Sequence, residues 1–277
     1  MHAILVATDL SHRSDRAMAR AFLIAAETGA RLIALAVVDE DLPEPLAETV
    51  MEKTRERLSA LCETLRQNND VAHEEMVVFG DPIRDINRVA DEVGADLIVV
   101  GRHRLRPFMD LFVSTTVEKI VRVASVPVLL TCGLADRPYE RAVSAVDLSP
   151  ASAAALRIAR LVAPKAKIHA FHAYSVPFRG FIGGDHPSEG GRGLFRAAAQ
   201  AELEEWKART HLPEDLGDVD LVEAAVGEAL RAAIAREKPD FLALGAHGRA
   251  ALSPTRLGSF TEELLRDPPC DLLIARR

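Results

Sequence analysis

The sequence predicts two tandem α/β domains, each a doubly wound, five-stranded parallel sheet with helices on both faces. Three observations lead to this fold class. Short apolar runs alternate with longer helical stretches along the whole chain. These runs are continuous rather than alternating, which is typical of strands buried on both faces of a parallel sheet. The pattern then occurs twice within 277 residues, a length at which two domains are expected.

Strands and helices alternate in the first half in the order that produces a sheet covered by helices on both faces. The expected elements are strand 3–8, helix 14–28, strand 31–38, helix 45–69, strand 72–78, helix 82–93, strand 96–100, helix 115–124 and strand 127–131. In the second half, strands are expected near 142–147, 167–173, 219–225, 241–244 and 271–275.

The two halves share motifs at nearly constant spacing. The matching pairs are Val6-Ala-Thr-Asp9-Leu-Ser11 with Ser144-Ala-Val-Asp147-Leu-Ser149, Asp96-Leu-Ile-Val-Val-Gly101 with Asp240-Phe-Leu-Ala-Leu-Gly245, and Glu118-Lys-Ile-Val-Arg122 with Glu262-Glu-Leu-Leu-Arg266. Such a repeat indicates a duplicated domain. We therefore expect one domain in residues 1–134 and a second in residues 140–277.

Composition narrows the functional classes. Hydrophobic residues make up 48% of the chain and charged residues 27%, with a formal net charge of -7. A mildly acidic chain lacks the basic face that nucleic-acid binding needs. No apolar run approaches the length of a membrane span, and the first residues lack the features of a signal peptide. We expect a cytoplasmic protein that binds neither nucleic acid nor membrane.

The three cysteines, Cys62, Cys132 and Cys270, stand singly along the chain. They form no CxxC pair and no zinc-finger spacing, so the sequence predicts no metal site. Single cysteines of this kind fit a reducing compartment.

A glycine-rich loop in the second half is the main candidate site. It reads Gly245-Ala-His247-Gly248, then nine residues, then Gly258-Ser259-Phe260-Thr261-Glu262. Its first glycine follows a strand at the carboxyl end, where ligands bind in open α/β sheets. Glycines also let a phosphate approach the backbone closely. The alternative is that they only make a tight turn from strand to helix.

The helix that follows the loop supplies the expected anion site. Ser259 and Glu262 have capping-box spacing, which places Ser259 at the N-cap. The free amides of the first turn and the helix dipole attract an anion. The hydroxyls of Ser259 and Thr261 can add donors, and His247 can touch phosphate or remain a solvated loop residue. Asp147 can accept hydrogen bonds from a ribose or an adenine; alternatively, Asp147 or Ser149 caps the next helix.

The first-strand Asp-Leu-Ser motif, the Gly-x2-Gly-x9-Gly-Ser loop and the apolar last strand resemble the universal stress protein family. The likeness covers nearly the whole chain, twice. It implies a Rossmann-like domain in each half and, in one branch of the family, bound ATP. Family members often pair through their last strands, so the resemblance implies an internal pseudo-dimer, and a homodimer of whole chains is left open.

The resemblance also implies which residues hold the nucleotide. Ala173, at the end of the second strand, would face the adenine, and Leu244 would pack near the base. The expected ATP site, with or without Mg²⁺, consists of Val146, Asp147, Ala173, Leu244, Gly245, His247, Gly248, Gly258, Ser259, Phe260 and Thr261.

The first half departs from this pattern. Its loop reads Gly101-Arg-His-Arg104, then nine residues, then Ser114-Thr115. Side chains at Arg104 and Ser114 disfavour positive φ angles, and Arg104 would fill the phosphate space. We expect this half not to bind ATP in the usual pose. The cationic loop residues either bind a different anion, stay solvated or pair with acidic groups of the other half: Arg102, His103, Arg104 and Arg106.

These features predict a regulatory, stress-response protein whose conformation or association depends on ATP. A slow ATPase or autokinase and a nucleotide-independent interaction module are the alternatives, and the sequence predicts no catalytic residue. Its protein partners are unknown. The glycine-rich stretch 178–195 reads as a flexible loop that either covers the nucleotide as a lid or lies on the surface.

Overall fold

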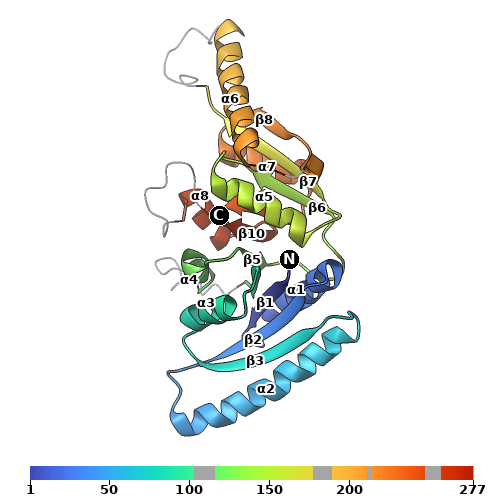
Figure 1. Cartoon of the computed structure of the whole chain (residues 1–277). Helices are drawn as coiled ribbons and strands as arrows, with labels where there is room; N and C mark the ends of the chain where they lie inside the picture. The colour runs from blue at the N-terminus through green and yellow to red at the C-terminus, as the bar shows by residue number, and fades with distance from the viewer. Residues whose placement is uncertain (103–115, 177–188, 211, 213, 247–256, 277) are drawn as a thin grey trace.

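The structure is a computed structural model that describes residues 1–102, 116–176, 189–210, 212, 214–246 and 257–276 (Figure 1). Its strands are β1 (Ala3–Thr8), β2 (Arg31–Asp39), β3 (His73–Gly80), β4 (Leu97–Gly101), β5 (Val128–Thr131), β6 (Arg141–Ala145), β7 (Lys167–Tyr174), β8 (Val219–Glu223), β9 (Phe241–Gly245) and β10 (Asp271–Ala275). Its helices are α1 (Ser14–Thr28), α2 (Glu44–Arg66), α3 (Pro82–Glu92), α4 (Thr116–Val123), α5 (Pro150–Val162), α6 (Glu189–Thr210), α7 (Val226–Glu237) and α8 (Ser259–Arg266), with a 3-10 turn at Glu214–Leu216.

All these strands belong to one continuous ten-stranded sheet, in the order β3-β2-β1-β4-β5-β10-β9-β6-β7-β8. Each half contributes five parallel strands, with its own first strand beside its fourth. The two halves meet where β5 pairs antiparallel with β10, with Leu129 opposite Leu273. The predicted fold class is confirmed, and the two halves do pair through their last strands.

Helices cover both faces of the sheet, and each face has its own core. On one face, α1, α2, α5 and α6 pack over a core that includes Phe22, Leu58 and Trp206. On the other face, α3, α4, α7 and α8 pack over a core that includes Ile86 and Leu230. The strands between them are therefore buried on both sides, which explains why their apolar runs are continuous.

The two edge strands, β3 and β8, carry more polar residues than the central strands. Glu74 is exposed on β3 and Asp220 is exposed on β8. Charged side chains on an edge strand discourage further strand pairing.

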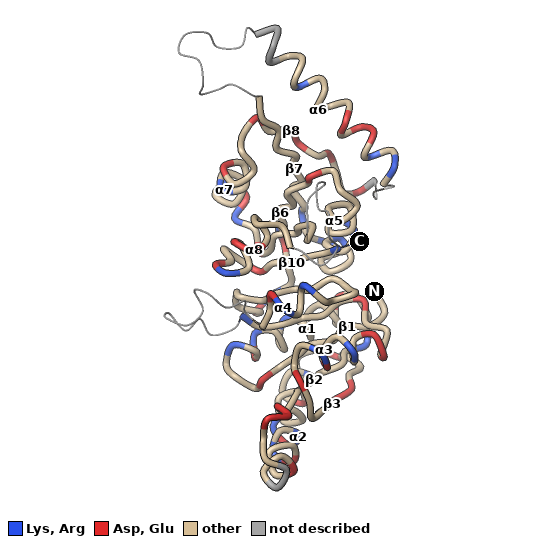
Figure 2. Tube along the Cα trace, turned by 90° about the vertical axis from the view of Figure 1, so that its left-hand side faces the viewer, with Lys and Arg blue, Asp and Glu red and all other residues tan. Residues whose placement is uncertain are grey.

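Figure 2 shows Lys and Arg interspersed with Asp and Glu along the length of the described chain. None of the helices in the described part is long and apolar enough to cross a membrane.

The second half departs from the expected pattern after its second strand. Helix α6 begins at Glu189, so residues 189–195 are helical and not part of a flexible loop as predicted. The apolar side chains further along α6, among them Leu203 and Trp206, are buried against the core. This packing outweighs the low helix propensity of the glycines near the helix start. Residues 177–188 lie outside the described residues, as does any role for them as a lid.

A buried carboxylate ties the connection between the halves to the last strand. Asp271 is 2% exposed. Its Oδ1 accepts hydrogen bonds from the backbone N–H groups of Cys132 at 2.7 Å and Gly133 at 2.8 Å. Its Oδ2 accepts a 2.5 Å bond from the Tyr139 hydroxyl. Burial, followed by the charge of Asp271, raises the pKa of Tyr139 well above its usual value, so Tyr139 remains a donor.

Arg20 completes this network from helix α1. Its guanidinium lies over the Tyr139 ring, 3.9 Å from the centroid, and 3.8 Å from Oδ2 of Asp271. Its terminal nitrogens donate to the carbonyl oxygens of Arg137 and Leu134 at 2.8 and 2.9 Å. One cation and one anion thus hold the segment between β5 and β6 against both halves.

Helices α4 and α8 contribute a second link between the halves. Arg122 of α4 donates to Glu262 of α8 at 2.7 Å, and Arg266 of α8 donates to Glu118 of α4 at 3.3 Å. These are equivalent positions of the repeat, so the two ion pairs are reciprocal. The sequence repeat identified all four residues, but only the strand pairing brings them together.

We expect Asp271→Asn to lower the free energy of unfolding by about 3 kcal/mol, because it removes the charge that faces Arg20 in a buried site. Urea denaturation followed by circular dichroism and by the fluorescence of the single tryptophan, Trp206, measures the change. Asp218→Asn, whose side chain is 97% exposed, is the matched control and should leave stability unchanged. A loss below about 0.5 kcal/mol for Asp271→Asn would contradict the role given to this carboxylate.

A double-mutant cycle on Arg122→Ala and Glu262→Ala should give a coupling free energy of about 1 kcal/mol, because both side chains are partly buried. The same cycle on the exposed pair Arg209 and Glu205, 3.8 Å apart within α6, should give less than about 0.5 kcal/mol. Equal coupling in the two cycles would show that the link between helices α4 and α8 adds nothing beyond a surface ion pair.

Candidate functional site

The candidate site lies at the carboxyl ends of the first and fourth strands of each half. These strands are β1 and β4 in the first half and β6 and β9 in the second. Strand order reverses between them, which makes this the topological switch point where open α/β sheets bind ligands. The same geometry is therefore built twice, and the halves differ in the side chains that fill it.

In the second half, the predicted Asp147 lies in a tight turn at the end of β6. Its Oδ1 accepts hydrogen bonds from the backbone N–H of Ser149 at 3.0 Å and from the Ser149 hydroxyl at 2.6 Å. Ser149 in turn accepts from the N–H of Ser152 at 3.1 Å and is the N-cap of α5. The alternative in which Ser149 caps the helix and Asp147 is a turn residue therefore describes the structure. Both bonds to Asp147 use Oδ1.

The first half repeats this turn with Asp9. Its Oδ1 accepts from the backbone N–H of Ser11 at 3.0 Å and from the Ser14 hydroxyl at 2.7 Å. Burial alone would raise the pKa of Asp9, but the hydrogen bonds from Ser11 and Ser14 outweigh it and lower the pKa. The carboxylate is therefore ionised at neutral pH.

A leucine in each turn adopts a backbone angle that leucine rarely takes. The φ angle is 55° at Leu10 and 61° at Leu148. Both lie in the left-handed region, which costs energy for a residue with a large side chain. Such angles cluster at functional sites, and here they turn the chain sharply beside the carboxylates of Asp9 and Asp147.

The first glycine of the loop has a packing role in both halves. A Cβ on Gly245 would lie 3.0 Å from the backbone nitrogen of Ser152 and 3.1 Å from the Cβ of Ala151. A Cβ on Gly101 would lie 2.9 Å from the carbonyl oxygen of Arg13. Each glycine thus lets the first helix of its half approach the end of the fourth strand. This explains why the first half keeps this glycine alone of the three.

The start of helix α8 differs from the prediction. Gly258, not Ser259, is the N-cap, and Ser259 is the first helical residue. Among the residues that the structure describes, no side chain caps this end of the helix. The predicted capping box was wrong because the helix begins one residue earlier, so that the Ser259 hydroxyl no longer has N-cap geometry.

Two hydrogen bonds fasten this helix to the end of β9. The N–H of Gly258 donates to the carbonyl of Ala246 at 2.9 Å. The Thr261 hydroxyl, expected to face phosphate, donates to the carbonyl of Gly245 at 3.2 Å. As a result, the uncapped amides of the first helical turn are held beside the end of the strand. His247 and Gly248 lie outside the described residues.

The apolar members of the predicted site also come to this edge. Leu244 lies beside Ala145 on β6 and is 3% exposed, and Val146 is 4% exposed. Ala173 is half-buried near the end of β7. Phe260 is half-buried and packs on the same core as Leu244. All described members of the predicted site thus lie at the carboxyl edge of the second half.

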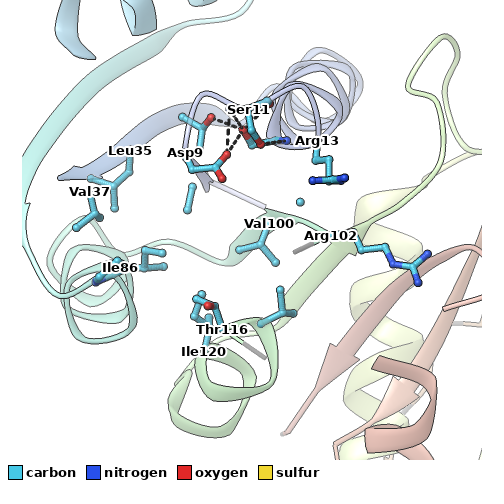
Figure 3. Close-up of a pocket in the computed structure, with 16 residues that line it drawn as sticks. Asp9, Ser11, Arg13, Leu35, Val37, Ile86, Val100, Arg102, Thr116 and Ile120 are labelled. Atoms are coloured by element: carbon cyan, nitrogen blue, oxygen red, sulfur yellow. Dashed lines mark hydrogen bonds between the residues drawn. The ribbon is translucent and has the colours of Figure 1, made fainter. Parts of the chain in front are cut away.

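The first half contains a cavity of about 460 Å³ at the corresponding place (Figure 3). Its walls are apolar and its rim is polar. Prominent apolar residues are Leu35, Val37, Ile86, Val100 and Ile120, and the polar ones include Asp9, Ser11, Arg13, Arg102 and Thr116. Sequence reasoning missed this cavity because it looked for loop glycines, which the first half has lost.

Strand register shows that the cavity and the predicted site are equivalent. Ala7 pairs with Leu35 in the first half, and its counterpart Ala145 pairs with Phe171 in the second. Two residues further along, Val37 corresponds to Ala173. Val37 lines the cavity, so the position inferred for Ala173 faces the equivalent space.

Arg102 has a partner in the other half. Its guanidinium lies 3.3 Å from a carboxylate oxygen of Asp267, just after α8. For this residue the structure agrees with the alternative in which loop arginines pair with acidic groups across the interface. The remaining cationic residues of that loop, and the two residues at its end, lie outside the described residues: His103, Arg104, Arg106, Ser114 and Thr115.

Comparisons with known proteins agree with the duplicated architecture. The sequence model of the universal stress protein family matches residues 1–131 and again residues 138–276. A curated relative is a Thermus aquaticus protein named as the universal stress protein in the QAH/OAS sulfhydrylase 3′ region. It is 33% identical over 131 residues, which span 46% of this chain and 96% of the relative.

Two solved structures resemble the whole chain. A universal stress protein from Archaeoglobus fulgidus aligns with a TM-score of 0.66 and 18% identity, over 99% of this chain and 98% of the relative. A functionally unknown protein from Pseudomonas aeruginosa PAO1 aligns with a TM-score of 0.67 and 19% identity, over 100% and 92%. These structures support the fold, and the two family matches show that the chain belongs to the universal stress protein family and carries its domain twice.

Proposed function

We propose that this universal stress protein is a stress-response regulator that binds ATP in its C-terminal half. The observation that carries the proposal is the start of helix α8. Its first turn has no side-chain cap from the described part of the chain, and it is fastened to the end of β9 at the switch point of the second half. Backbone amides in this position, together with the helix dipole, favour a phosphate group.

The surroundings suit the rest of an adenine nucleotide. Ala173 is half-buried on the same face of the sheet as Leu244 and Phe260, and apolar surface of this kind packs against a base. Val146 packs in the core on the opposite face. Asp147, at the end of β6, has a second carboxylate oxygen, Oδ2, beyond the one used in its turn. That oxygen can accept a bond from a ribose hydroxyl. In the first half the equivalent positions enclose about 460 Å³, which lies within the range of small-molecule pockets.

A regulatory role fits this site better than catalysis. Phosphoryl transfer needs a positioned base and a cation at the γ-phosphate. Among the described side chains around the junction, Ser259 is exposed and the Thr261 hydroxyl is engaged with Gly245. We infer that bound ATP stabilises one conformation or association of the chain, which unidentified protein partners then recognise.

ATP should raise the melting temperature of the protein, with a stabilisation of about 2.7 kcal/mol when ATP exceeds its Kd a hundredfold. Gly258→Asp should abolish this shift without harming the fold, because aspartate is a favoured N-cap residue whose charge repels phosphate. Thermal unfolding with and without ATP and Mg²⁺ measures both effects.

Gly258→Asn is the matched control for charge. It provides a similar cap without the negative charge, so it should keep part of the ATP response. If Asp and Asn variants respond to ATP like the unmodified protein, phosphate does not bind at this helix.

Ala173→Phe should also remove the ATP-dependent stabilisation, because a phenyl ring would fill the space expected for the base. Val37→Phe, its counterpart in the first half, should leave the ATP response unchanged. Isothermal titration of both variants with ATP separates the two halves. Loss of binding in Val37→Phe but not in Ala173→Phe would move the nucleotide site to the N-terminal cavity.

A further inference from the structure

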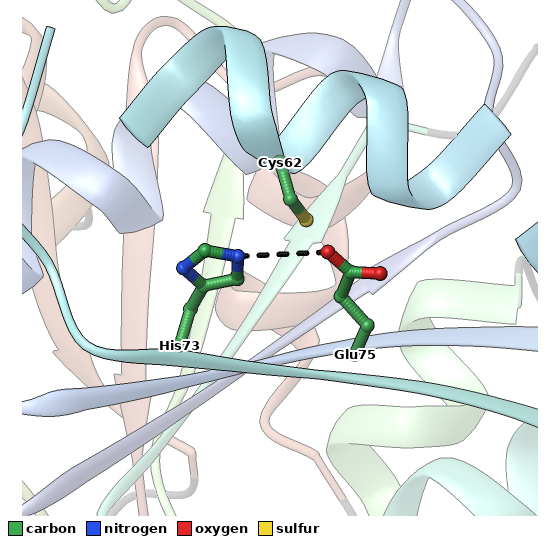
Figure 4. Close-up of side chains that lie close together, drawn as sticks. All are labelled: Cys62, His73 and Glu75. Carbon is green, nitrogen blue, oxygen red and sulfur yellow. Dashed lines mark ion pairs between the residues drawn. The ribbon is translucent and has the colours of Figure 1, made fainter. Parts of the chain in front are cut away.

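Three potential metal ligands meet at the outer end of the first half, far from the switch point in the sheet order. Cys62 comes from helix α2, whereas His73 and Glu75 come from the edge strand β3. Residues two apart on a strand point to the same face, and this face is the one that α2 covers. Figure 4 shows the thiol aimed at the space between the imidazole and the carboxylate. The three ligand atoms lie within 4.8 Å of one another.

The two ring nitrogens of His73 have different neighbours. Nδ1 lies 3.4 Å from the carbonyl oxygen of Val71, to which it can donate a hydrogen bond. In the neutral tautomer that makes this bond, Nε2 carries a lone pair. It lies 3.5 Å from a carboxylate oxygen of Glu75. Two acceptors at this separation repel each other unless a proton on Nε2 or a metal ion lies between them.

We propose that Cys62, His73 and Glu75 form a site for a Zn²⁺-class ion that links helix α2 to strand β3. A thiolate, an imidazole and a carboxylate are the ligand types that Zn²⁺ takes in proteins. Hard cations such as Mg²⁺ and Ca²⁺ require an all-oxygen shell, which this cluster does not offer. The bond from Nδ1 to Val71 is the kind of outer contact that orients a metal-binding imidazole.

The distances fit tetrahedral coordination after a small adjustment. Standard zinc bond lengths place neighbouring ligand atoms about 3.3–3.6 Å apart. The His73 and Glu75 atoms are already 3.5 Å apart. The Cys62 sulfur is at most 4.8 Å from these atoms, so it must approach by about 1.3 Å at most to reach the same separation.

A cavity of about 340 Å³ lies beside the proposed site, along α2 and β3. Glu75 lines it, together with Arg55, Glu56, Leu58, Ser59 and Val77. Glu75 is exposed and is therefore the ligand nearest to solvent. A bound dication would displace the proton of the Cys62 thiol.

Sequence patterns carry no sign of this site, because the ligands follow no known zinc motif. Cys62 and His73 are separated by ten residues, which hold the end of the helix and the turn into the strand. Only the packing of α2 on β3 brings the ligands together. The proposal therefore departs from the expectation, drawn from cysteine spacing, that the chain holds no metal, and that expectation stays a prediction.

Titration of tag-free, chelator-treated protein with Co²⁺ tests the site. One equivalent should bind, with a thiolate-to-cobalt charge-transfer band in the near ultraviolet and the intense visible bands of tetrahedral cobalt. One equivalent of Zn²⁺ should displace it. Cys62→Ala should remove the charge-transfer band and weaken binding at least a hundredfold, more than the loss of an outer-shell partner costs.

Two further variants keep the test decisive. His73→Asn, on the edge strand, should weaken Co²⁺ binding as well, and it applies even if a change at the buried Cys62 disturbs folding. Cys132→Ser combined with Cys270→Ser leaves the cluster intact and should keep the full cobalt spectrum. Absence of cobalt binding by the unmodified protein, or a band that survives Cys62→Ala, would overturn the proposal and leave His73 and Glu75 as a simple ion pair.

Discussion

The architecture depends on the antiparallel pairing of β5 with β10, which turns two separate sheets into one. A strand edge left open is a template for association with other chains. Here each half covers the edge of the other. The buried carboxylate of Asp271 stabilises this junction, because it satisfies two backbone N–H groups of the connecting segment and the Tyr139 hydroxyl at once. Arg20 balances its charge.

This pairing also lets the two copies of the domain diverge. Once the halves are joined in one chain, each can keep the interface while its switch point changes. Both copies retain the acidic turn at Asp9 and Asp147 and the close packing at Gly101 and Gly245. These features hold the first helix against the fourth strand, so they are needed for the fold whether or not a ligand binds.

The proposed nucleotide site and the proposed metal site lie in different halves and on different elements. The first uses backbone amides at the start of α8. The second uses side chains between α2 and the edge strand β3. An ion at Cys62 would stabilise the outermost layer of the N-terminal half, where the sheet has no further strand to pair with. The two proposals are therefore physically independent.

The sequence by itself determined the fold class, the duplication and all ten strands of the described chain, because burial on both faces of a parallel sheet imposes continuous apolar runs that need no tertiary information. It also located the switch point, since a strand followed by Asp-Leu-Ser or by glycine recurs in both halves.

Only the tertiary structure decided which side chains meet across elements. Residues that are distant in the chain meet in three places. These are the reciprocal ion pairs of Arg122 with Glu262 and of Arg266 with Glu118, the N-terminal cavity, and the Cys62 cluster. Local patterns carry no record of such contacts, because they depend on how helices pack on the sheet. Helix α8 begins one residue earlier than its sequence predicts for a related reason. Its start is determined by hydrogen bonds to the end of β9 and not by its own capping motif.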